Sequence, residues 1–456
     1  MIGVIGIIIS LALLMYLAYR GITVLLLAPV LALLAVVFSG EMPLLVTYTE
    51  LFMKDFAGYA KTYFPLFLLG AVFGKIMDDS GAAKSIANFI AHKLGKDKAI
   101  LAVVLSCAVL TYGGVSLFVV AFAVYPIAVE LFKEANLPKR LIPGAIALGA
   151  FTFTMTALPG TPQIQNAIPM TYFGTTAWAA PVLGIIGSIV IFVLGMMWLN
   201  KRAKSAVDAG EGYGNHKEEK LESVDVSNLP NIVVAILPIV VVLVLNYIIG
   251  VYLVKIPSEY LKSYGTSIDK VKGLWSLIVA LVISSILAVA LMRKNFKSII
   301  KTINDGAIGS LLAIANTSSE VGYGNVIKAL GAFALVKGAI LAIPGTPLIS
   351  LSVSTSVLAG ITGSASGGMS IALGALGDIY MQKALAMGMN PEVFHRIAAI
   401  ACGGFDTLPH NGAVITLLGI TGLTHKDSYA DIGMCTVVIP VVATAVCIIG
   451  ASFGLV

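Results

Sequence analysis

The sequence has little charge. Of its 456 residues only 11% are Asp, Glu, Lys or Arg, whereas 58% are hydrophobic, and the mean hydropathy is +0.96. A soluble domain carries about 25% charged residues, so this composition excludes an ordinary soluble enzyme. Several apolar runs reach the roughly 20 residues that a helix needs to cross a bilayer. We therefore expect an all-α polytopic membrane protein; a β-barrel would show short alternating segments instead.

Sequence motifs for metal, nucleotide or nucleic-acid binding are missing too. The four cysteines and five histidines show no metal-ligand spacing and no disulfide framework. There is no Walker A sequence, no dinucleotide fingerprint and no nucleophile elbow, and no basic patch with interleaved aromatic residues. We expect no enzyme activity, no cofactor, no metal and no nucleic acid partner. The net charge of +6 is typical of the cytoplasmic excess of Lys and Arg in membrane proteins. The chain opens in an apolar run, which we interpret as a retained first transmembrane helix.

Charge is absent from residues 99–129, yet this run is interrupted at its centre by Thr111-Tyr112-Gly113-Gly114-Val115-Ser116. Each apolar arm is too short to span a bilayer comfortably, and basic residues stand before and after the pair. We therefore predict a re-entrant helical hairpin at residues 98–133. Backbone at membrane depth must find hydrogen-bond partners, so such a break survives only inside protein or beside a wet cavity.

The same kind of interruption recurs three more times. We predict a broken helix at 141–173, a second hairpin at 339–388 and a second broken helix at 391–421, with their breaks at 156–166, 362–368 and 406–412. Gly114 and Gly368 are 254 residues apart, as are Asn136 and Asn390. If the first hairpin enters from the cytoplasm, as the flanking basic residues indicate, the count of helices four to eight places the second on the opposite side. We therefore predict two inverted-topology repeats, the arrangement found in many secondary transporters.

This repeat suggests a division of the chain into transport elements and a scaffold. Residues 62–175 and 303–425 would carry the hairpins and broken helices, and would move as the transport domain. The scaffold and dimer surface would comprise residues 1–61 (two helices and an aromatic interfacial segment), 176–302 (helices five to seven, with a cytoplasmic linker at 201–228) and 426–456 (the last helix). The basic loop at 255–272 is not assigned to a side.

The four breaks have the chemistry of an anion site. At each break the following half-helix presents free backbone N–H groups and the positive end of its dipole, glycine allows close approach, and Ser and Thr add donors. A carboxylate could bind there without a buried arginine. The candidate substrate-binding residues are Thr111, Tyr112, Gly113, Gly114, Ser116, Thr156, Gly160, Thr161, Gln163, Asn166, Ser364, Ser366, Gly367, Gly368, Thr407 and Asn411. The alternative is that the small residues serve helix packing and the amides only cap freed backbone.

Ionisable residues are few in the apolar segments, so each is a candidate for ion coupling. Asp406 and His410 are four apart and would share a helix face if the helical turn persists, and His titrates near physiological pH. Glu320, in a polar patch that begins at Asn316, is a second candidate carboxylate. The alternative for Asp406 and His410 is a structural hydrogen bond at a helix break.

The motifs at these breaks resemble those of the gluconate/hydroxyacid permease family of the ion transporter superfamily. The resemblance covers nearly the whole chain and rests on Thr111–Phe118, Thr156–Asn166, Ser366–Ser370 and Asp406–Gly412, which are most similar to the 3-hydroxybutyrate permease-like branch. It implies proton-coupled uptake of small hydroxycarboxylates, a homodimer, and elevator-type movement. Gluconate permeases have a proline- and histidine-rich first break where this chain has Leu158-Pro159-Gly160-Thr161-Pro162-Gln163. A shorter acid than gluconate is therefore expected.

Our hypothesis from the sequence is a secondary active transporter in the cell (inner or plasma) membrane of a prokaryote, which carries a small organic anion such as 3-hydroxybutyrate together with H⁺. The alternatives are a Na⁺-coupled carboxylate transporter, including one for citrate-like acids, and a cation antiporter. A channel is disfavoured because the breaks contain no rings of charge.

Overall fold

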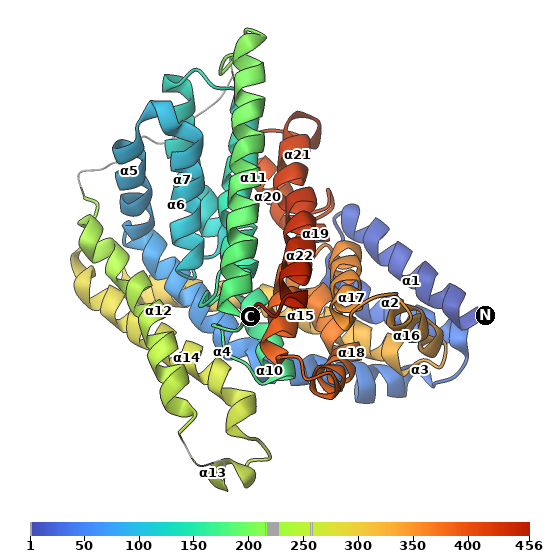
Figure 1. The fold of residues 1–456 in the computed structure, drawn as a ribbon. Helices are drawn as coiled ribbons and strands as arrows, with labels where there is room; N and C mark the ends of the chain where they lie inside the picture. The colour runs from blue at the N-terminus through green and yellow to red at the C-terminus, as the bar shows by residue number, and fades with distance from the viewer. Residues whose placement is uncertain (1, 215, 217–227, 256, 258) are drawn as a thin grey trace.

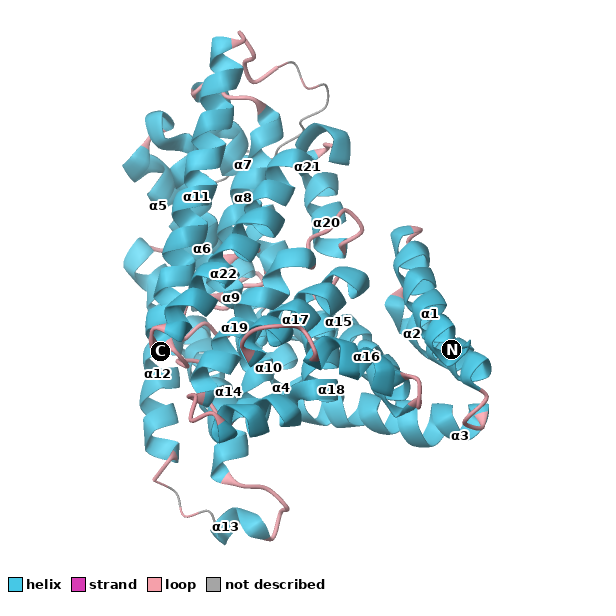
Figure 2. Cartoon of the chain, turned by 45° about the vertical axis from the view of Figure 1, so that its right-hand side comes forward, coloured by secondary structure: helices cyan, strands magenta, loops and turns pink. Residues whose placement is uncertain are grey.

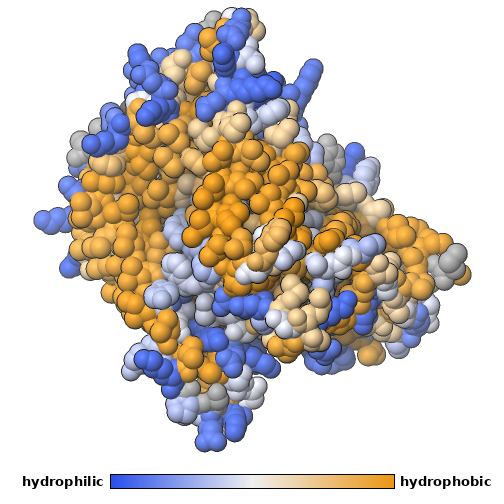
Figure 3. Space-filling view, viewed as in Figure 1, coloured by the Kyte–Doolittle hydropathy of each residue, from blue (hydrophilic) through white to orange (hydrophobic). Residues whose placement is uncertain are grey.

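All elements are helical in the computed structural model (Figure 1), which describes residues 2–214, 216, 228–255, 257 and 259–456. Within these residues, five helices are long and apolar enough to cross a membrane, or six if one bent pair is counted as a span. Figure 3 shows hydrophobic residues over the middle of one face and hydrophilic residues at its upper and lower ends. Such a surface suits a protein surrounded by lipid.

The first half of the chain forms twelve principal elements. They are α1 (Ile2–Tyr19), α2 (Val24–Ser39), α3 (Leu44–Val46), the π-helical η1 (Thr47–Phe52), α4 (Met53–Asp79), α5 (Ala82–Leu94), α6 (Ala99–Tyr112), α7 (Leu117–Glu134), α8 (Ile142–Ala150), α9 (Phe153–Thr156), α10 (Ile164–Phe173) and α11 (Pro181–Asp208). Short 3-10 turns η2 (Lys96–Lys98) and η3 (Lys139–Leu141) precede α6 and α8.

The second half of the chain continues this series of helices. It comprises α12 (Ile232–Leu253), α13 (Glu259–Lys262), α14 (Ile268–Leu291), the 3-10 turn η4 (Arg293–Asn295), α15 (Ile299–Ala329), α16 (Phe333–Leu341), α17 (Pro347–Thr362), α18 (Ala365–Ala386), α19 (Pro391–Phe405), α20 (Gly412–Thr421), α21 (His425–Gly433), the π-helical η5 (Met434–Val438) and α22 (Ile439–Ser452).

Helical hairpins and broken helices form where the polar interruptions predict them. The pairs α6–α7 and α17–α18 pack arm against arm, with loops at 113–116 and 363–364. Each pair is followed by a helix that breaks, at 157–163 and at 406–411, and both breaks contain proline, which cannot continue a helix. The second hairpin begins later than expected, at Pro347, because residues 333–341 form the separate helix α16.

Two predicted boundaries are wrong because nothing in the sequence ends the helix there. Residues 44–79 form one continuous helical run, α3–η1–α4, so the interfacial segment expected at 40–61 is the first part of the helix expected after it. Likewise α15 continues from Ile299 through the polar patch at 316–320. The boundaries placed at 61/62 and 302/303 therefore lie inside helices.

The predicted spacing of 254 residues between the halves is also wrong. Three pairs of residues with the same local role are 248 residues apart: the first-turn prolines Pro143 and Pro391, the N-caps Ser116 and Ser364, and the N-caps Gln163 and Asn411. Gly368 is not the counterpart of Gly114. It lies in the first turn of α18, where a β-carbon would overlap the Ala359 backbone, so close packing of the two arms requires glycine there.

The helices fall into groups by their packing (Figures 1 and 2). Helices α4 and α15 lie side by side across the molecule, and α12 pairs with α14. Helices α1 and α2 form a separate apolar cluster with Phe52, Tyr323 and neighbouring residues. In contrast, α11 and α22 pack against each other and against α19, so they lie with the broken helices.

An ion cluster joins the start of α8 to α11 and α21. The buried carboxylate of Asp431 accepts hydrogen bonds from Arg140 (3.3 Å), Arg202 (2.9 Å) and Trp198 (3.0 Å). Arg140 also forms a two-fold contact with Glu211 at 2.7 and 2.8 Å, and this hydrogen bonding lowers the pKa of Glu211 from its ordinary value. The linker expected at 201–228 begins as helix, since α11 extends to Asp208. Its residues 215 and 217–227 lie outside the described part of the chain, as do residues 256 and 258 of the basic loop.

Candidate functional site

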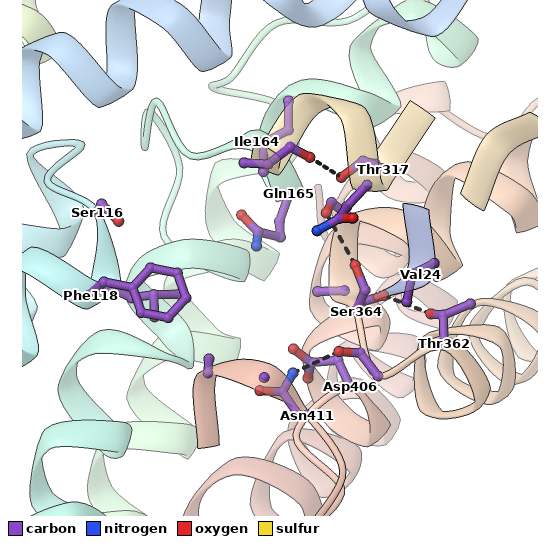
Figure 4. Close-up of a pocket in the computed structure, with 18 of the residues that line it drawn as sticks. Val24, Ser116, Phe118, Ile164, Gln165, Thr317, Thr362, Ser364, Asp406 and Asn411 are labelled. Carbon is purple, nitrogen blue, oxygen red and sulfur yellow. Dashed lines mark hydrogen bonds between the residues drawn. The ribbon is translucent and has the colours of Figure 1, made fainter. Parts of the chain in front are cut away.

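The four polar breaks meet at one cavity of about 640 Å³, which α15 and the α1–α2 connection also line (Figure 4). Ten of the predicted site residues are on its wall. They are Gly114, Ser116, Gln163, Glu320, Ser364, Ser366, Asp406, Thr407, His410 and Asn411. The N-terminal ends of α7, α10, α18 and α20 all contribute to this wall. Helix N-termini attract anions, so the arrangement suits a small anionic ligand.

The other predicted residues lie behind the wall. They are Thr111, Tyr112, Gly113, Thr156, Gly160, Thr161, Asn166, Gly367 and Gly368. Several of them have identifiable packing roles. Gly160, at φ +85°, lies against the indole of Trp178, and its carbonyl accepts a hydrogen bond from Asn246 at 3.3 Å. This ties the first break to α12.

The first hairpin tip is attached to the first break by three contacts. The Gln163 amide donates to the Thr111 carbonyl (2.8 Å) and to the Val115 carbonyl (3.3 Å). The Tyr112 hydroxyl donates to the Pro159 carbonyl at 2.7 Å. Gly114, at φ +94°, packs so closely on the Pro162 ring that a β-carbon would lie 2.8 Å from it. The tip and the break therefore form one unit.

The second tip is attached in the same manner to the second break. The Asn411 side chain donates to the Gly363 carbonyl at 2.8 Å and accepts from the Val414 N–H at 2.9 Å, which caps α20. The His410 ring covers Gly363, where a β-carbon would lie 2.9 Å from the ring. The expectation that Asp406 and His410 share a helix face is wrong, because 406–411 is not helical. Both nevertheless line the cavity.

Two acidic side chains lie around the second tip with incomplete hydrogen bonding. Glu320 is only 4% exposed and Asp406 only 9%. Among the described residues, Glu320 Oε2, Asp406 Oδ1 and His410 Nε2 have no hydrogen-bond partner. Burial of a carboxylate without full pairing is costly, and ionisable residues at membrane depth are functional candidates for that reason.

A buried arginine lies behind the first break, outside the cavity wall. Arg396 of α19 is fully buried and donates to the Ala179 carbonyl (2.7 and 3.1 Å), to the Ala177 carbonyl (3.3 Å) and to Asn166 Oδ1 (3.0 Å). His395 lies beside it, with Nε2 3.1 Å from the same Asn166 oxygen. The sequence analysis did not single out these two residues, although the adjacent basic residues His395 and Arg396 within a largely apolar segment could have identified them.

Further cavity residues were absent from the predicted set. Asn316 and Thr317 lie one turn before Glu320 on the cavity side of α15, a face that helical spacing could have identified. Gln165, in the first turn of α10, is 7% exposed, and its Oε1 has no partner in the described structure. Figure 4 shows its side chain between the first break and α15. The residues that the structure describes contain no group of three or more His, Cys, Asp or Glu placed to hold a metal ion.

Comparisons with known proteins agree with this architecture. The family model described as "GntP family permease" matches residues 2–453. The uncharacterized transporter YxjC of Bacillus subtilis is 46% identical over 467 residues, and the alignment covers 99% of each chain. An uncharacterized transporter of Haemophilus influenzae is 30% identical over 141 residues, which is 30% of this chain and 33% of that one.

A solved structure has a similar fold. The YdaH transporter of Alcanivorax borkumensis superposes with a TM-score of 0.56 at 17% identity, over 88% of both chains. This likeness concerns the fold alone.

Proposed function

The chain belongs to the GntP permease family, and from this premise we propose that it is a secondary active transporter that carries a small hydroxycarboxylate together with a proton. Family membership supports a multi-pass membrane transporter rather than an enzyme. The choice of substrate and of coupling ion is our proposal.

The observation that carries the proposal is the composition of the cavity wall. Four helix N-termini face one space, no Lys or Arg of the described residues lines it, and Arg396 is held behind the wall by carbonyl groups. Backbone N–H groups and polar side chains of the wall, such as Ser116, Ser364 and Ser366, are thus the donors available to an anion. A cavity of about 640 Å³ is ample for a four-carbon hydroxyacid, and the resemblance to 3-hydroxybutyrate permeases favours that size.

The proton would bind at the second tip. Asp406, His410 and Glu320 are the titratable residues that line the cavity, and all three have a polar atom without a partner among the described residues. Since the substrate is an anion, a proton on one of these groups offsets its charge during passage through the membrane. Na⁺ is the second candidate, because unpartnered carboxylate oxygens beside serine hydroxyls are also hard oxygen ligands.

We propose an elevator movement of two inverted repeats in a homodimer, with a revised division of the chain. The moving body would comprise α6–α11 and α17–α22, because α11 and α22 pack with the broken helices. Helices α1, α2, α4, α12, α14 and α15 would form the stationary scaffold. This assignment replaces the predicted one, in which α4 and α15 moved and α11 and α22 were stationary.

Uptake into proteoliposomes tests the function. The purified protein should accumulate labelled 3-hydroxybutyrate when the lumen is made alkaline, and should not require Na⁺. A panel of competing carboxylates, from lactate to citrate and gluconate, then ranks substrates by size. Absence of uptake of every acid at any imposed pH or Na⁺ gradient would refute the proposal.

The coupling residues need a separate measurement. We expect Asp406→Asn and His410→Ala to abolish accumulation driven by a pH gradient while equal-concentration exchange of substrate continues. Unchanged accumulation in both variants would reject their role in coupling.

A further inference from the structure

The two hairpin tips differ in what α4 and α15 place against them. At the first tip α4 contributes Gly74, where a β-carbon would lie 3.4 Å from the Ser116 nitrogen. At the second tip α15 contributes Glu320, whose carboxylate lies so close to Gly367, in the first turn of α18, that a β-carbon there would overlap it. A carboxylate of the chain itself therefore lies at the second helix N-terminus, whereas a glycine lies at the first.

The contact between Glu320 and α18 is very close. A β-carbon on Gly367 would overlap the Glu320 carboxylate, so only glycine at this position allows the approach. The Ser364 hydroxyl accepts from the Gly367 N–H at 3.1 Å, and the preceding N–H groups of the first turn have no acceptor within the helix. Glu320 is thus placed where an anion gains from both the free N–H groups and the dipole.

The contact is nevertheless incomplete. Glu320 is 4% exposed, yet its Oε2 has no partner among the residues that the structure describes. The carboxylate also lines the cavity, together with Thr317 on the same face of α15 and Ser366 on the tip. A buried anion that is only partly satisfied and borders the cavity can be displaced at low cost.

We propose that the N-terminus of α18 is a carboxylate subsite that Glu320 fills when the cavity is empty and that the carboxylate of the substrate occupies during transport. The inference rests on the proposed function and specifies its binding step. Two carboxylates cannot share the position while both are charged. Glu320 therefore takes up a proton from the solution and leaves the helix terminus, and the substrate anion replaces it.

Other titratable groups face the same tip. Tyr59 of α4 lies near Glu320, and Asp406 and His410 of the second break line the cavity beside Ser364 and Ser366. None of these is placed against Gly367. Their protonation changes the electrostatic potential at the second tip. Glu320 is the one of these groups that competes with the substrate for the N-terminus of α18.

Binding measurements on the full-length protein in nanodiscs test the inference, with 3-hydroxybutyrate as the probe at pH 5.5 and pH 8. For the wild type we expect weaker binding at pH 8 than at pH 5.5, because a larger fraction of Glu320 is charged at the higher pH. Glu320→Gln removes the competing charge and should bind at least about tenfold more tightly than the wild type at pH 8, with little difference at pH 5.5. Glu130→Gln, at an exposed position at the end of α7, is the matched control and should behave as the wild type.

A second substitution tests whether the substrate uses the same position. Gly367→Ala places a methyl group where the carboxylate lies, so in the Glu320→Gln background it should remove the gain in affinity. Gly419→Ala, in α20 with no atom within 4 Å of the added methyl, is the matched control. If Glu320→Gln does not fold, Glu320→Asp withdraws the carboxylate by one methylene and should give a smaller gain.

The outcomes separate the two proposals. Binding in the wild type with equal affinity in Glu320→Gln at pH 8, or a gain that persists with Gly367→Ala, overturns the subsite and leaves the proposed function intact. A folded wild type that binds no carboxylate at either pH rejects the proposed function, and the subsite with it.

Discussion

The two hairpin tips of this permease are attached to their breaks in the same way but differ in the charge of the residues around them. In each half an amide side chain at the N-cap after the break, Gln163 or Asn411, donates to a carbonyl of the tip at 2.8 Å. Among the described residues, the first half places no acidic residue on the cavity wall, whereas the second places Glu320 and Asp406 there. The two tips thus share an arrangement but differ in chemistry, and we infer that the acidic half responds to the proton.

The two halves are not structurally independent, because the first break depends on Arg396 from the second half. This arginine is the donor to the Ala179 carbonyl and also donates to the Ala177 carbonyl and to Asn166 Oδ1. We expect Arg396→Leu to lower the free energy of unfolding by about 3–5 kcal/mol, since it removes these charge-assisted hydrogen bonds and leaves the buried Ala179 carbonyl without a donor. Thermal unfolding in detergent measures this. Arg293→Leu, at an exposed position after α14, should change stability by about 0.5 kcal/mol or less; equal effects would contradict the account.

A second dependence joins the halves at the other end of the broken helices. Asp431 of α21 accepts from Arg140, which precedes α8, and from Arg202 and Trp198 of α11. Asp431→Asn keeps the shape but removes the charge, and should cost about 1.5–3 kcal/mol. Chemical unfolding of the purified protein would measure the loss. Wild-type stability in this variant would show that the cluster does not hold the moving body together.

The side-chain amides of Gln163 and Asn411 can be compared directly by substitutions that remove the N–H donor and keep the size of the side chain. Gln163→Glu and Asn411→Asp each lose the hydrogen bond to the tip, and Asp can still cap α20. We expect each to cost about 1–2 kcal/mol and to slow substrate exchange roughly tenfold, since misplacement of a tip disturbs the cavity. Exchange assays in proteoliposomes are the measurement. Loss in only one variant would mean that the two tips are not equivalent in their attachment.

Much of this comparison could be predicted from sequence, and the misses have physical reasons. Polar interruptions that contain glycine or proline indicated breaks in the apolar runs, so the hairpins and broken helices were predictable from residues 111–116 and 406–412. The spacing of the halves was not, because glycine serves turns at Gly114 but arm packing at Gly368, and one sequence cannot distinguish these uses.

Other features depend on contacts between distant segments. Arg396 reaches Asn166 across 230 residues, and no local pattern reports such a contact. The approach of Glu320 to Gly367 is likewise a tertiary contact. The sequence therefore identified Glu320 as a candidate carboxylate but did not predict its position against α18. The continuity of 44–79 was missed because aromatic, mixed-polarity residues resemble an interfacial helix although nothing in them ends a helix.

The smallest expected effect concerns the surface pair Arg140–Glu211. Hydrogen bonding to Arg140 lowers the pKa of Glu211, so the contribution to stability is present above the unfolded value of about 4.3 and is lost as pH falls through the lower folded value. Because Glu211 is 42% exposed, Glu211→Gln should cost about 0–1 kcal/mol at pH 7. Unfolding of both proteins at pH 7 and below pH 4 measures it. A difference that persists at the acidic pH would contradict the assignment.

The role of the acidic half in proton coupling is tested most directly by the accumulation of labelled 3-hydroxybutyrate in proteoliposomes with an alkaline lumen. We predict that the wild type concentrates the acid above its level in the medium. A variant with both Glu320→Gln and Asp406→Asn should exchange the acid but only equalise its concentration. Accumulation by that variant to the level of the wild type would contradict the account, because the proton would then be carried outside the acidic half.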